Sequence, residues 1–450
     1  MGTLPSARAL MGASLGFHII YAAIGVGMPL LLCVAEGLAL LTGREVYRDL
    51  ARRWSKVVAV LLAIGAVSGT VLSFELGLLW PTFMRFAGGI IGMPFSLEGF
   101  AFFIEAIFVA LYLYGWNVLS PRAHWLTSIP VVIGSAASAV CVISANAWMN
   151  TPAGFRVVDG QPVDVHVWKA FFNPAMPIEA LHGTLACYVA TAMAAAGIYA
   201  WALLRGDPAR RLYNRAGLKL ALGVAAVALP LQLVAGDISA RFVANYEPAK
   251  LAAMEGLFTT TRGAPEVIGG WPDPASGKVI GGIAIPKLLS FLAYDDFNAT
   301  VRGLDSFPAG TTPDPRMVHP VFDIMVGSGF LMLAALILFG IIAWRKRHAG
   351  GASASRVALL ATLVAAPFGF IALESGWLTT EFGRQPWIVH GFLKTSEAVT
   401  PRGGIDVIFL LLMLVYLALT AGLLWLLLAP WQGPRWLPRA WREVGHAAHS

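Results

Sequence analysis

The sequence predicts an all-α integral membrane protein with about nine transmembrane helices. Of its 450 residues, 57% are hydrophobic and only 13% are charged, a balance far from that of a soluble globular protein. Apolar runs of roughly 20 residues, the length that crosses a bilayer, begin near positions 14, 56, 95, 125, 179, 216, 320, 355 and 404. The first run continues to about residue 41, too long for a cleavable signal, so it is interpreted as a retained helix. The chain, 1–450, is therefore expected to form a single polytopic membrane domain.

The pattern of basic residues predicts how the helices are oriented. The formal net charge is +7, but the basic residues stand in short clusters between apolar runs, which argues against nucleic-acid binding and for insertion topology. The positive-inside rule then places the N-terminus outside and the C-terminus in the cytoplasm. The clusters are Arg44, Arg48, Arg52, Arg53 and Lys56; Arg205, Arg210, Arg211, Arg215 and Lys219; Arg345, Lys346, Arg347 and Arg356; and Arg435, Arg439 and Arg442.

One connection is much longer than the others. About 80 residues, 237–319, rich in glycine and proline, join the sixth and seventh runs on the predicted outer side. The segment is too polar to span a membrane and too long to be a turn, so we expect it to have a functional role.

Side chains that can ligate iron lie within the apolar runs, where burying an ionisable group needs a partner or a function. Because neighbouring helices alternate in direction, His18, His182, Met325 and Glu374 are expected at a similar depth near the outer face. A His/Met pair is typical of low-spin haem iron, and a single histidine or carboxylate can leave a coordination position open. Each residue alone is compatible with core packing, but their convergence favours a haem site.

Two acids are expected early in the third helix, at a depth similar to that of these ligands. Glu98 and Glu105 are seven residues apart, so they point the same way about 10 Å apart along the helix axis. Two such carboxylates repel when both are ionised, which favours one of them carrying a proton. A proton relay fits this arrangement, and a water-exposed helix start is the alternative.

Six stretches together resemble subunit I of the cytochrome bd-type quinol oxidases. The resemblance extends from Arg8 to about residue 430, through nine helices in the expected order. The stretches are SLEGFAFFIEAIF (96–108), ANAWMNTP (145–152), NPAMPIEALHGT (173–184), KLAAME (250–255), ESGW (374–377) and GRQPW (383–387).

The resemblance implies roles for particular residues. His182 and Met325 correspond to the axial pair of a low-spin haem b, and His18 and Glu374 to the ligands of two high-spin haems, a second haem b and haem d. Which of the two serves which high-spin haem stays open. The outer segment is of the short kind found in the cyanide-insensitive subgroup, in which haem b can replace haem d.

Other correspondences concern the surroundings of the haems and the quinol. Lys250 and Glu255 match loop residues associated with quinol oxidation, which makes 237–319 a quinol-binding loop; an ordinary surface ion pair is the alternative. Arg8 and Arg384 are candidates to neutralise haem propionates, although Arg8 also suits an interfacial anchor. The resemblance implies proton delivery by Glu98 and Glu105, and haem surroundings that include Gln385 and Trp387.

The implied function is that of the haem-containing subunit of a terminal oxidase in the bacterial cytoplasmic (inner) membrane. It would oxidise quinol near the outer face, reduce dioxygen to water and build a membrane potential by vectorial proton uptake without pumping. A second large membrane subunit and small single-helix subunits are the implied partners. One departure is Asp323, which stands where well-known members have an arginine.

Two functions of other classes remain as alternatives. A dihaem cytochrome passing quinol electrons to another acceptor would use His182 and Met325 but would not need Glu374 or His18. A proton-coupled transporter could use Glu98 and Glu105, yet neither an internal repeat nor helices broken at mid-membrane are evident in the sequence.

Overall fold

Membrane-length helices dominate the protein, as the hydropathy pattern predicts. The structure, a computed structural model, describes residues 3–346 and 355–428. Within these residues, nine segments are long and apolar enough to span a bilayer, which confirms the predicted fold class. They are α1 (Thr3–Thr42), α2 (Glu45–Leu79), α3 (Pro81–Gly115), α4 (Pro121–Asn150), α6 (Met176–Arg205), α7 (Arg211–Tyr246), α10 (Pro315–Arg345), α11 with α12 (Arg356–Ala365 and Phe368–Gly383) and α14 (Ile405–Leu428).

The first three helices begin earlier than the apolar runs suggest. They start at Thr3, Glu45 and Pro81 rather than near 14, 56 and 95. Hydropathy marks only the part that lies in lipid, whereas α2 continues through its basic first turns and α3 continues across Pro94. The expectation that Glu98 and Glu105 lie early in the third helix is therefore wrong: Glu98 lies at the middle of α3 and Glu105 in its second half.

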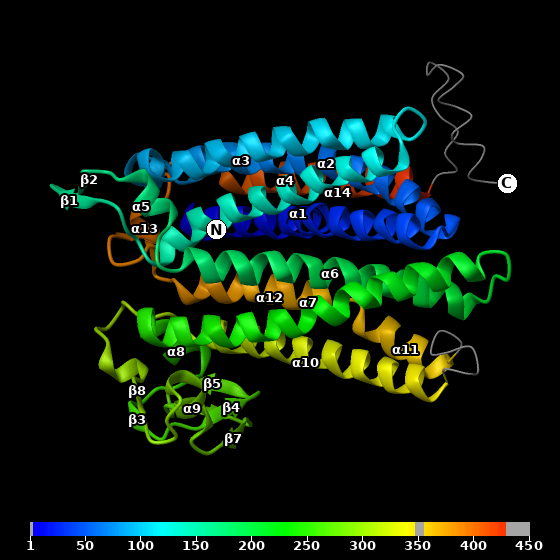
Figure 1. Ribbon diagram of the computed structural model, residues 1–450. Helices are drawn as coiled ribbons and strands as arrows, with labels where there is room; N and C mark the ends of the chain where they lie inside the picture. Colours follow the sequence, from blue (N-terminus) through cyan, green and yellow to red (C-terminus); the bar gives the residue numbers. More distant parts are fainter. Residues whose placement is uncertain (1–2, 347–354, 429–450) are drawn as a thin grey trace. The chain divides into compact units, whose positions relative to one another are not determined.

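Short elements gather at one end of the helices (Figure 1). The segment between α7 and α10 covers 247–314, less than the expected 237–319, because both flanking helices extend beyond the apolar runs. It contains α8 (Pro248–Met254), α9 (Leu288–Tyr294), η1 (Leu304–Ser306) and three antiparallel strand pairs. The pairs are β3 (Thr261–Arg262) with β8 (Thr300–Val301), β4 (Glu266–Ile268) with β7 (Ile283–Ile285), and β5 (Trp271–Asp273) with β6 (Lys278–Ile280).

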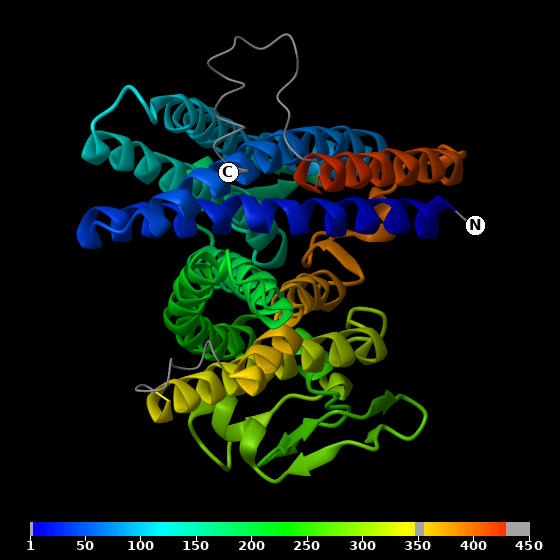
Figure 2. The ribbon, with the colours of Figure 1, turned by 90° about the vertical axis from the view of Figure 1, so that its right-hand side faces the viewer.

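Two smaller groups of elements lie at the same end (Figure 1). Between α4 and α6 stand a hairpin and a short helix, and after α12 stand a second strand pair and one helical turn. These are β1 (Arg156–Val158), β2 (Gln161–Val163) and α5 (Val167–Phe171), followed later by β9 (Trp387–Val389), β10 (Leu393–Lys394) and α13 (Thr395–Ala398). The strands of the 247–314 segment lie beside α10 in both views (Figure 1, Figure 2).

The chain divides into two compact units. Residues Ser14–Pro401 form the larger unit, which holds every predicted ligand and the 247–314 segment. The smaller unit joins the start of α1, including Arg8, to the segment that carries α14. Within the larger unit, Thr191 of α6 donates a hydrogen bond to the Ala23 carbonyl of α1 (3.1 Å), beside Gly27, where a Cβ would lie 2.2 Å from the Thr191 hydroxyl.

The predicted orientation remains a prediction. The structure contains no membrane, and four of the basic residues used for the positive-inside argument, Arg347, Arg435, Arg439 and Arg442, lie outside the described residues.

Candidate functional site

Glu374 lies on α12 between α1 and α10. A Cβ built on Gly16 of α1 would lie 3.5 Å from Glu374 Oε2. Two residues after Glu374, a Cβ on Gly376 would lie only 2.9 Å from Met325 Sδ of α10, so a side chain there would displace the thioether. Glu374 Oε1 is buried with no hydrogen-bond partner. An unpaired buried carboxylate oxygen is costly, and a metal bound at this position would satisfy it.

His18 is held in a ring orientation that suits a metal ligand. Its Nδ1 lies 2.8 Å from the Ser68 hydroxyl of α2, and that hydroxyl donates its own proton to the Ile64 carbonyl at 2.8 Å. Ser68 therefore accepts a hydrogen bond from His18, so Nδ1 carries the ring proton. The lone pair of Nε2 is then available to bind a metal ion. Gly69 lies opposite the ring, where a Cβ would be 3.4 Å from Cε1.

His182 lies near the start of α6 and faces α7. The Gln232 amide nitrogen is 3.3 Å from Nδ1 and 3.2 Å from Nε2, so it does not select one tautomer. The Gln232 Oε1 atom is buried without a partner, and a Cβ on Gly236 would lie 3.4 Å from the imidazole Cε1. Each of the four predicted ligands thus has a glycine beside it on a neighbouring helix, and a longer side chain there would fill that space.

Arg384 supplies a buried cation at the end of α12. Its Nη2 donates to Glu381 Oε2 at 2.6 Å, and Asn146 donates to the other Glu381 oxygen at 2.7 Å. Although Arg384 is only 3% exposed, its Nε and Nη1 are buried without partners. Buried guanidinium groups are normally paired with anions. A haem propionate has the charge and the geometry to satisfy these two donors, so the site fits the group that the ligands predict.

The neighbouring loop residues are anchored to the protein. Gln385 Oε1 accepts a hydrogen bond from the Thr395 hydroxyl at 2.9 Å, and Trp387 Nε1 donates to the Thr311 carbonyl at 3.4 Å. Lys394 lies over the Trp387 ring, 5.6 Å from its centroid. These contacts fix the loop that follows Arg384.

Lys250 does not form a surface ion pair with Glu255, so that alternative is wrong. Lys250 is buried, pairs with Glu247 and donates to Asn150 Oδ1 at 3.2 Å. Asn150 in turn donates to Glu179 Oε1 at 3.2 Å. A Cβ on Gly383 would lie 2.8 Å from Lys250 Cγ, which places the lysine directly beside the end of α12.

Glu255 instead belongs to an acidic cluster beneath the strand pairs. Its carboxyl group lies beside that of Glu266, whose Oε2 is buried without a hydrogen-bond partner, and two neighbouring buried carboxyl groups favour a proton on one of them. Burial, followed by the neighbouring Glu266, raises the pKa of Glu255, and burial raises the pKa of Glu266. His319 is fully buried nearby; its Nδ1 lies 2.7 Å from the Met254 carbonyl and its Nε2 3.3 Å from Asp323 Oδ2. Asp323 also accepts from the Gly269 amide at 2.9 Å.

The two acids of α3 both face α4. Ser138 donates to Glu98 Oε1 at 3.1 Å. Gly134, one turn earlier on α4, lies against Glu105, where a Cβ would be 3.2 Å from the Glu105 Cβ. The acids therefore line one α3–α4 interface, although Glu105 lies deeper along the helix than expected.

Several buried polar residues of this region do not stand out in the sequence. Glu247 and Glu381 lie at helix ends, where an acid is ordinary, and Glu266 begins the short strand β4. Glu75 of α2 could have been singled out from the sequence. It is an isolated acid in an apolar stretch, and it follows Ser68 by seven residues, on the same helix face. It accepts a hydrogen bond from Ser14 at 2.7 Å, and its second oxygen is buried without a partner.

The fold and the site define a polytopic helical membrane protein whose buried side chains suit haem iron. The sequence model of the family "Cytochrome bd terminal oxidase subunit I" matches residues 6–433. The chain belongs to this family. Its members are haem-containing quinol oxidases of bacterial respiratory electron transport, so the chain is a multi-pass subunit of a membrane oxidoreductase.

Individual relatives cover almost the whole chain. A Bacillus subtilis (strain 168) protein, provisionally named a cytochrome bd menaquinol oxidase subunit I, is 40% identical over 432 residues, 95% of this chain and 96% of the relative. Subunit 1 of the cytochrome bd-II ubiquinol oxidase of Escherichia coli (strain K12) is 30% identical, with 89% and 90% covered. The solved structure of bd oxidase from Geobacillus thermodenitrificans superimposes with a TM-score of 0.88 at 36% identity, covering 94% of this chain and 97% of that one.

Proposed function

We propose that this chain binds the haems of its oxidase and carries both the quinol-oxidising and the oxygen-reducing sites. The observation that carries the proposal is the set of unsatisfied buried atoms around α12. Glu374 Oε1 has no donor and Arg384 Nε and Nη1 have no acceptor. An iron porphyrin with propionates supplies a cation to the first and anions to the others.

The ligand assignment follows from the residue types and their surroundings. His182 and Met325 would hold a low-spin haem b, since a His/Met pair fills both axial positions. His18 and Glu374 would each hold a high-spin haem, a second haem b and haem d or a haem b in its place. Arg384 would pair with propionates, and Gln385 and Trp387 would keep the loop closed over the site. When bound, the haems would carry electrons from quinol to dioxygen.

Quinol oxidation needs a proton acceptor and a polar anchor at the loop side. Glu255 is a suitable acceptor, because Glu255 and Glu266 are neighbouring buried carboxyl groups that can hold one proton between them and release it. Lys250, buried beside Gly383, is placed to stabilise negative charge on a quinol oxygen through its ammonium group. Because Lys250 and Glu255 both belong to 247–314, we assign quinol binding to this segment. Protons taken from quinol here would leave on the outer side.

Oxygen reduction consumes protons that Glu98 and Glu105 would deliver along the α3–α4 interface. If these protons come from the cytoplasm, charge is separated without a pump, against about 2.3 kcal/mol per charge per 100 mV. The complex would include a second large subunit and small single-helix subunits. Arg8 remains a further candidate for a propionate partner.

Purified complex, reduced with dithionite, tests this function. We expect three haems per chain after extraction and chromatography, and a visible spectrum in which part of the haem binds carbon monoxide. Haem that fails to bind carbon monoxide would instead indicate an electron-relay cytochrome. A folded, colourless complex would indicate a transporter.

A further inference from the structure

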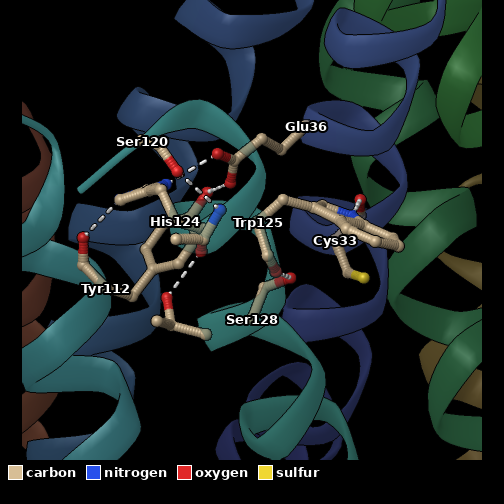
Figure 3. A network of polar contacts seen from close by, with 9 residues as sticks. Cys33, Glu36, Tyr112, Ser120, His124, Trp125 and Ser128 are labelled. Atoms are coloured by element: carbon tan, nitrogen blue, oxygen red, sulfur yellow. Dashed lines mark hydrogen bonds and ion pairs between the residues drawn. The ribbon is translucent and has the colours of Figure 1, made fainter.

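A second buried polar network joins α1, α3 and α4, about five turns along α1 from the proposed ligand His18. Glu36 of α1, Tyr112 of α3 and His124 of α4 are each at most 4% exposed. The Tyr112 hydroxyl donates to Glu36 Oε2 at 2.6 Å, and His124 Nδ1 lies 2.6 Å from Glu36 Oε1 (Figure 3). His124 Nε2 lies 2.8 Å from the Tyr112 carbonyl oxygen. The network therefore ties three helices near their ends.

The geometry fixes one shareable proton between Glu36 and His124. A backbone carbonyl only accepts, so the His124 Nε2 must carry a hydrogen. At the other ring nitrogen, either Nδ1–H donates to the Glu36 carboxylate, or a protonated Glu36 donates to Nδ1. In both forms one proton lies between the two groups, because without it two lone pairs would face each other at 2.6 Å.

The network stands in line with the acids of the proposed relay. Tyr112 follows Glu105 by seven residues on α3, as Glu105 follows Glu98, so the three side chains lie on one helix face with a rise of about 10 Å per step. A cavity of about 10 Å³ lies beside Tyr112, lined by Tyr112, Ser55 and otherwise apolar side chains such as Val109, and it does not reach Glu105. That is about the space for a single water.

The network also has a short route to the surface. Residues 117–122, from the α3–α4 connection to the first residues of α4, are exposed, and the Trp116 ring covers His124 with a centroid distance of 4.1 Å. Arg48 and Arg52 of α2 lie over the same Trp116 ring at 5.9 and 5.8 Å. Cys33 of α1 also lies near Tyr112, so Cys33, Arg48 and Arg52 are further ionisable groups close to the network.

We propose that Glu36, His124 and Tyr112 form the entry station of a proton path that continues along α3 to Glu105 and Glu98. This inference rests on the proposed function, which supplies the demand for protons. The Tyr112 hydroxyl passes its proton to a water on the Val109 side, and the proton shared by Glu36 and His124 replaces it. The extra proton then passes through further water molecules to the Glu105 carboxylate, because the cavity itself does not reach Glu105, and solvent reprotonates the pair. The alternative is a purely structural role, in which these hydrogen bonds only link α1, α3 and α4.

Tyr112→Phe in the holoenzyme complex is the primary test, because it removes one oxygen and leaves Glu36 and His124 in place. Reduced complex is mixed with oxygen, and proton uptake is followed with a pH-sensitive dye. We expect uptake at least tenfold slower than in wild type, with a larger solvent deuterium isotope effect and unchanged haem spectra and quinol KM. The matched control is Tyr114→Phe, an exposed tyrosine two residues further along α3, which should behave as wild type. Equal uptake in the two variants would overturn the proposal. The network would then only hold the three helices together.

A second measurement tests the shared proton without turnover. Infrared difference spectra between acidic and alkaline buffer should contain a protonated-carboxyl band in wild type that is absent in Glu36→Gln. If that variant does not assemble, the Tyr112→Phe comparison still decides. A wild-type complex without quinol:oxygen activity would defeat the proposed function, whereas an active wild type with an unaffected Tyr112→Phe defeats only the entry station.

Discussion

The two ends of the helices hold buried polar groups of opposite character. At the end that carries the predicted ligands, buried atoms of Glu374 and Arg384 on α12, and of Glu75 on α2, have no hydrogen-bond partner. In the network of Glu36 and His124, both carboxylate oxygens and both ring nitrogens are bonded. Burying an unpaired polar group costs about 1–3 kcal/mol, so the first region is complete only with something else bound, whereas the second is complete within the chain.

This difference separates two uses of the same residue types. A carboxylate or imidazole that lacks a partner is available to iron or to a propionate. One that is fully bonded can only exchange protons with its neighbours or hold helices together. The predictions below test whether that distinction holds, beginning with the largest expected effect.

Met325→Leu should remove the low-spin haem signal completely and leave the high-spin signals largely intact. Leucine has a similar volume but cannot ligate iron, and such swaps usually cost less than about 1.5 kcal/mol of stability. Reduced-minus-oxidised spectra and extracted haem per chain would measure the loss.

The matched control is Met332→Leu, a buried methionine seven residues later on the same helix, which should retain every haem. Loss of all haems together in Met325→Leu would show that the ligand assignment is wrong or that folding depends on that site.

Glu105→Gln should lower kcat for oxygen reduction by roughly 10²-fold, the scale of a positioned proton-transfer group, with little change in quinol KM. Steady-state oxygen consumption at varied quinol concentration separates the two parameters. Glu45→Gln, an exposed acid at the start of α2, is the control. Turnover equal to wild type would remove Glu105 from the proton path.

Much of the fold could be predicted because each span is a long apolar run, and hydropathy needs no knowledge of partners. The starts of α2 and α3 could not, since their first turns contain basic residues or precede Pro94 and do not look like lipid-facing helix. That error shifted Glu98 and Glu105 along the third helix relative to their expected positions.

The candidate site was predictable only where a residue type is rare in its context. His18, His182 and Glu374 stand out in apolar runs, and the structure places glycines beside each of them. The Glu36–His124 pair was not evident, because 88 positions separate two residues that each look like an isolated helix-end group. The partner of Glu255 could not be predicted either, since Glu266 comes beside it only when the short strands of the 247–314 segment fold.

Arg384→Gln should weaken haem retention by roughly tenfold, the lower end of the effect of removing an outer partner of a metal site. Arg384→Lys keeps the positive charge but loses the planar guanidinium group that can bind a carboxylate through two hydrogen bonds, so it should have a smaller effect. Haem per chain after a fixed wash with apomyoglobin as acceptor would rank the three proteins. If glutamine retained haem as well as arginine, the unpaired Nε and Nη1 atoms would not be propionate donors.

Glu266→Gln should move the acidic limb of the quinol-oxidation pH profile to lower pH, the smallest of these effects. Burial and then Glu266 raise the pKa of Glu255, so Glu255 is protonated, and a poor acceptor, until the pH passes that raised pKa. Glutamine removes the second cause and donates an amide hydrogen bond to the ionised carboxylate, so Glu255 ionises at lower pH. Asp296→Asn, an exposed acid of the same segment, should leave the profile unchanged.

The raised pKa of Glu255 should also make thermal stability depend on pH. A carboxyl group whose folded pKa is raised contributes stability at acidic pH that is lost as pH rises through the folded value. Wild type should therefore lose thermal stability with rising pH more steeply than Glu266→Gln, which lacks one member of the pair. Parallel melting curves across pH, together with an unshifted rate profile, would mean that the two carboxyl groups do not share a proton in the working enzyme, and the acceptor would have to be sought beside Lys250 instead.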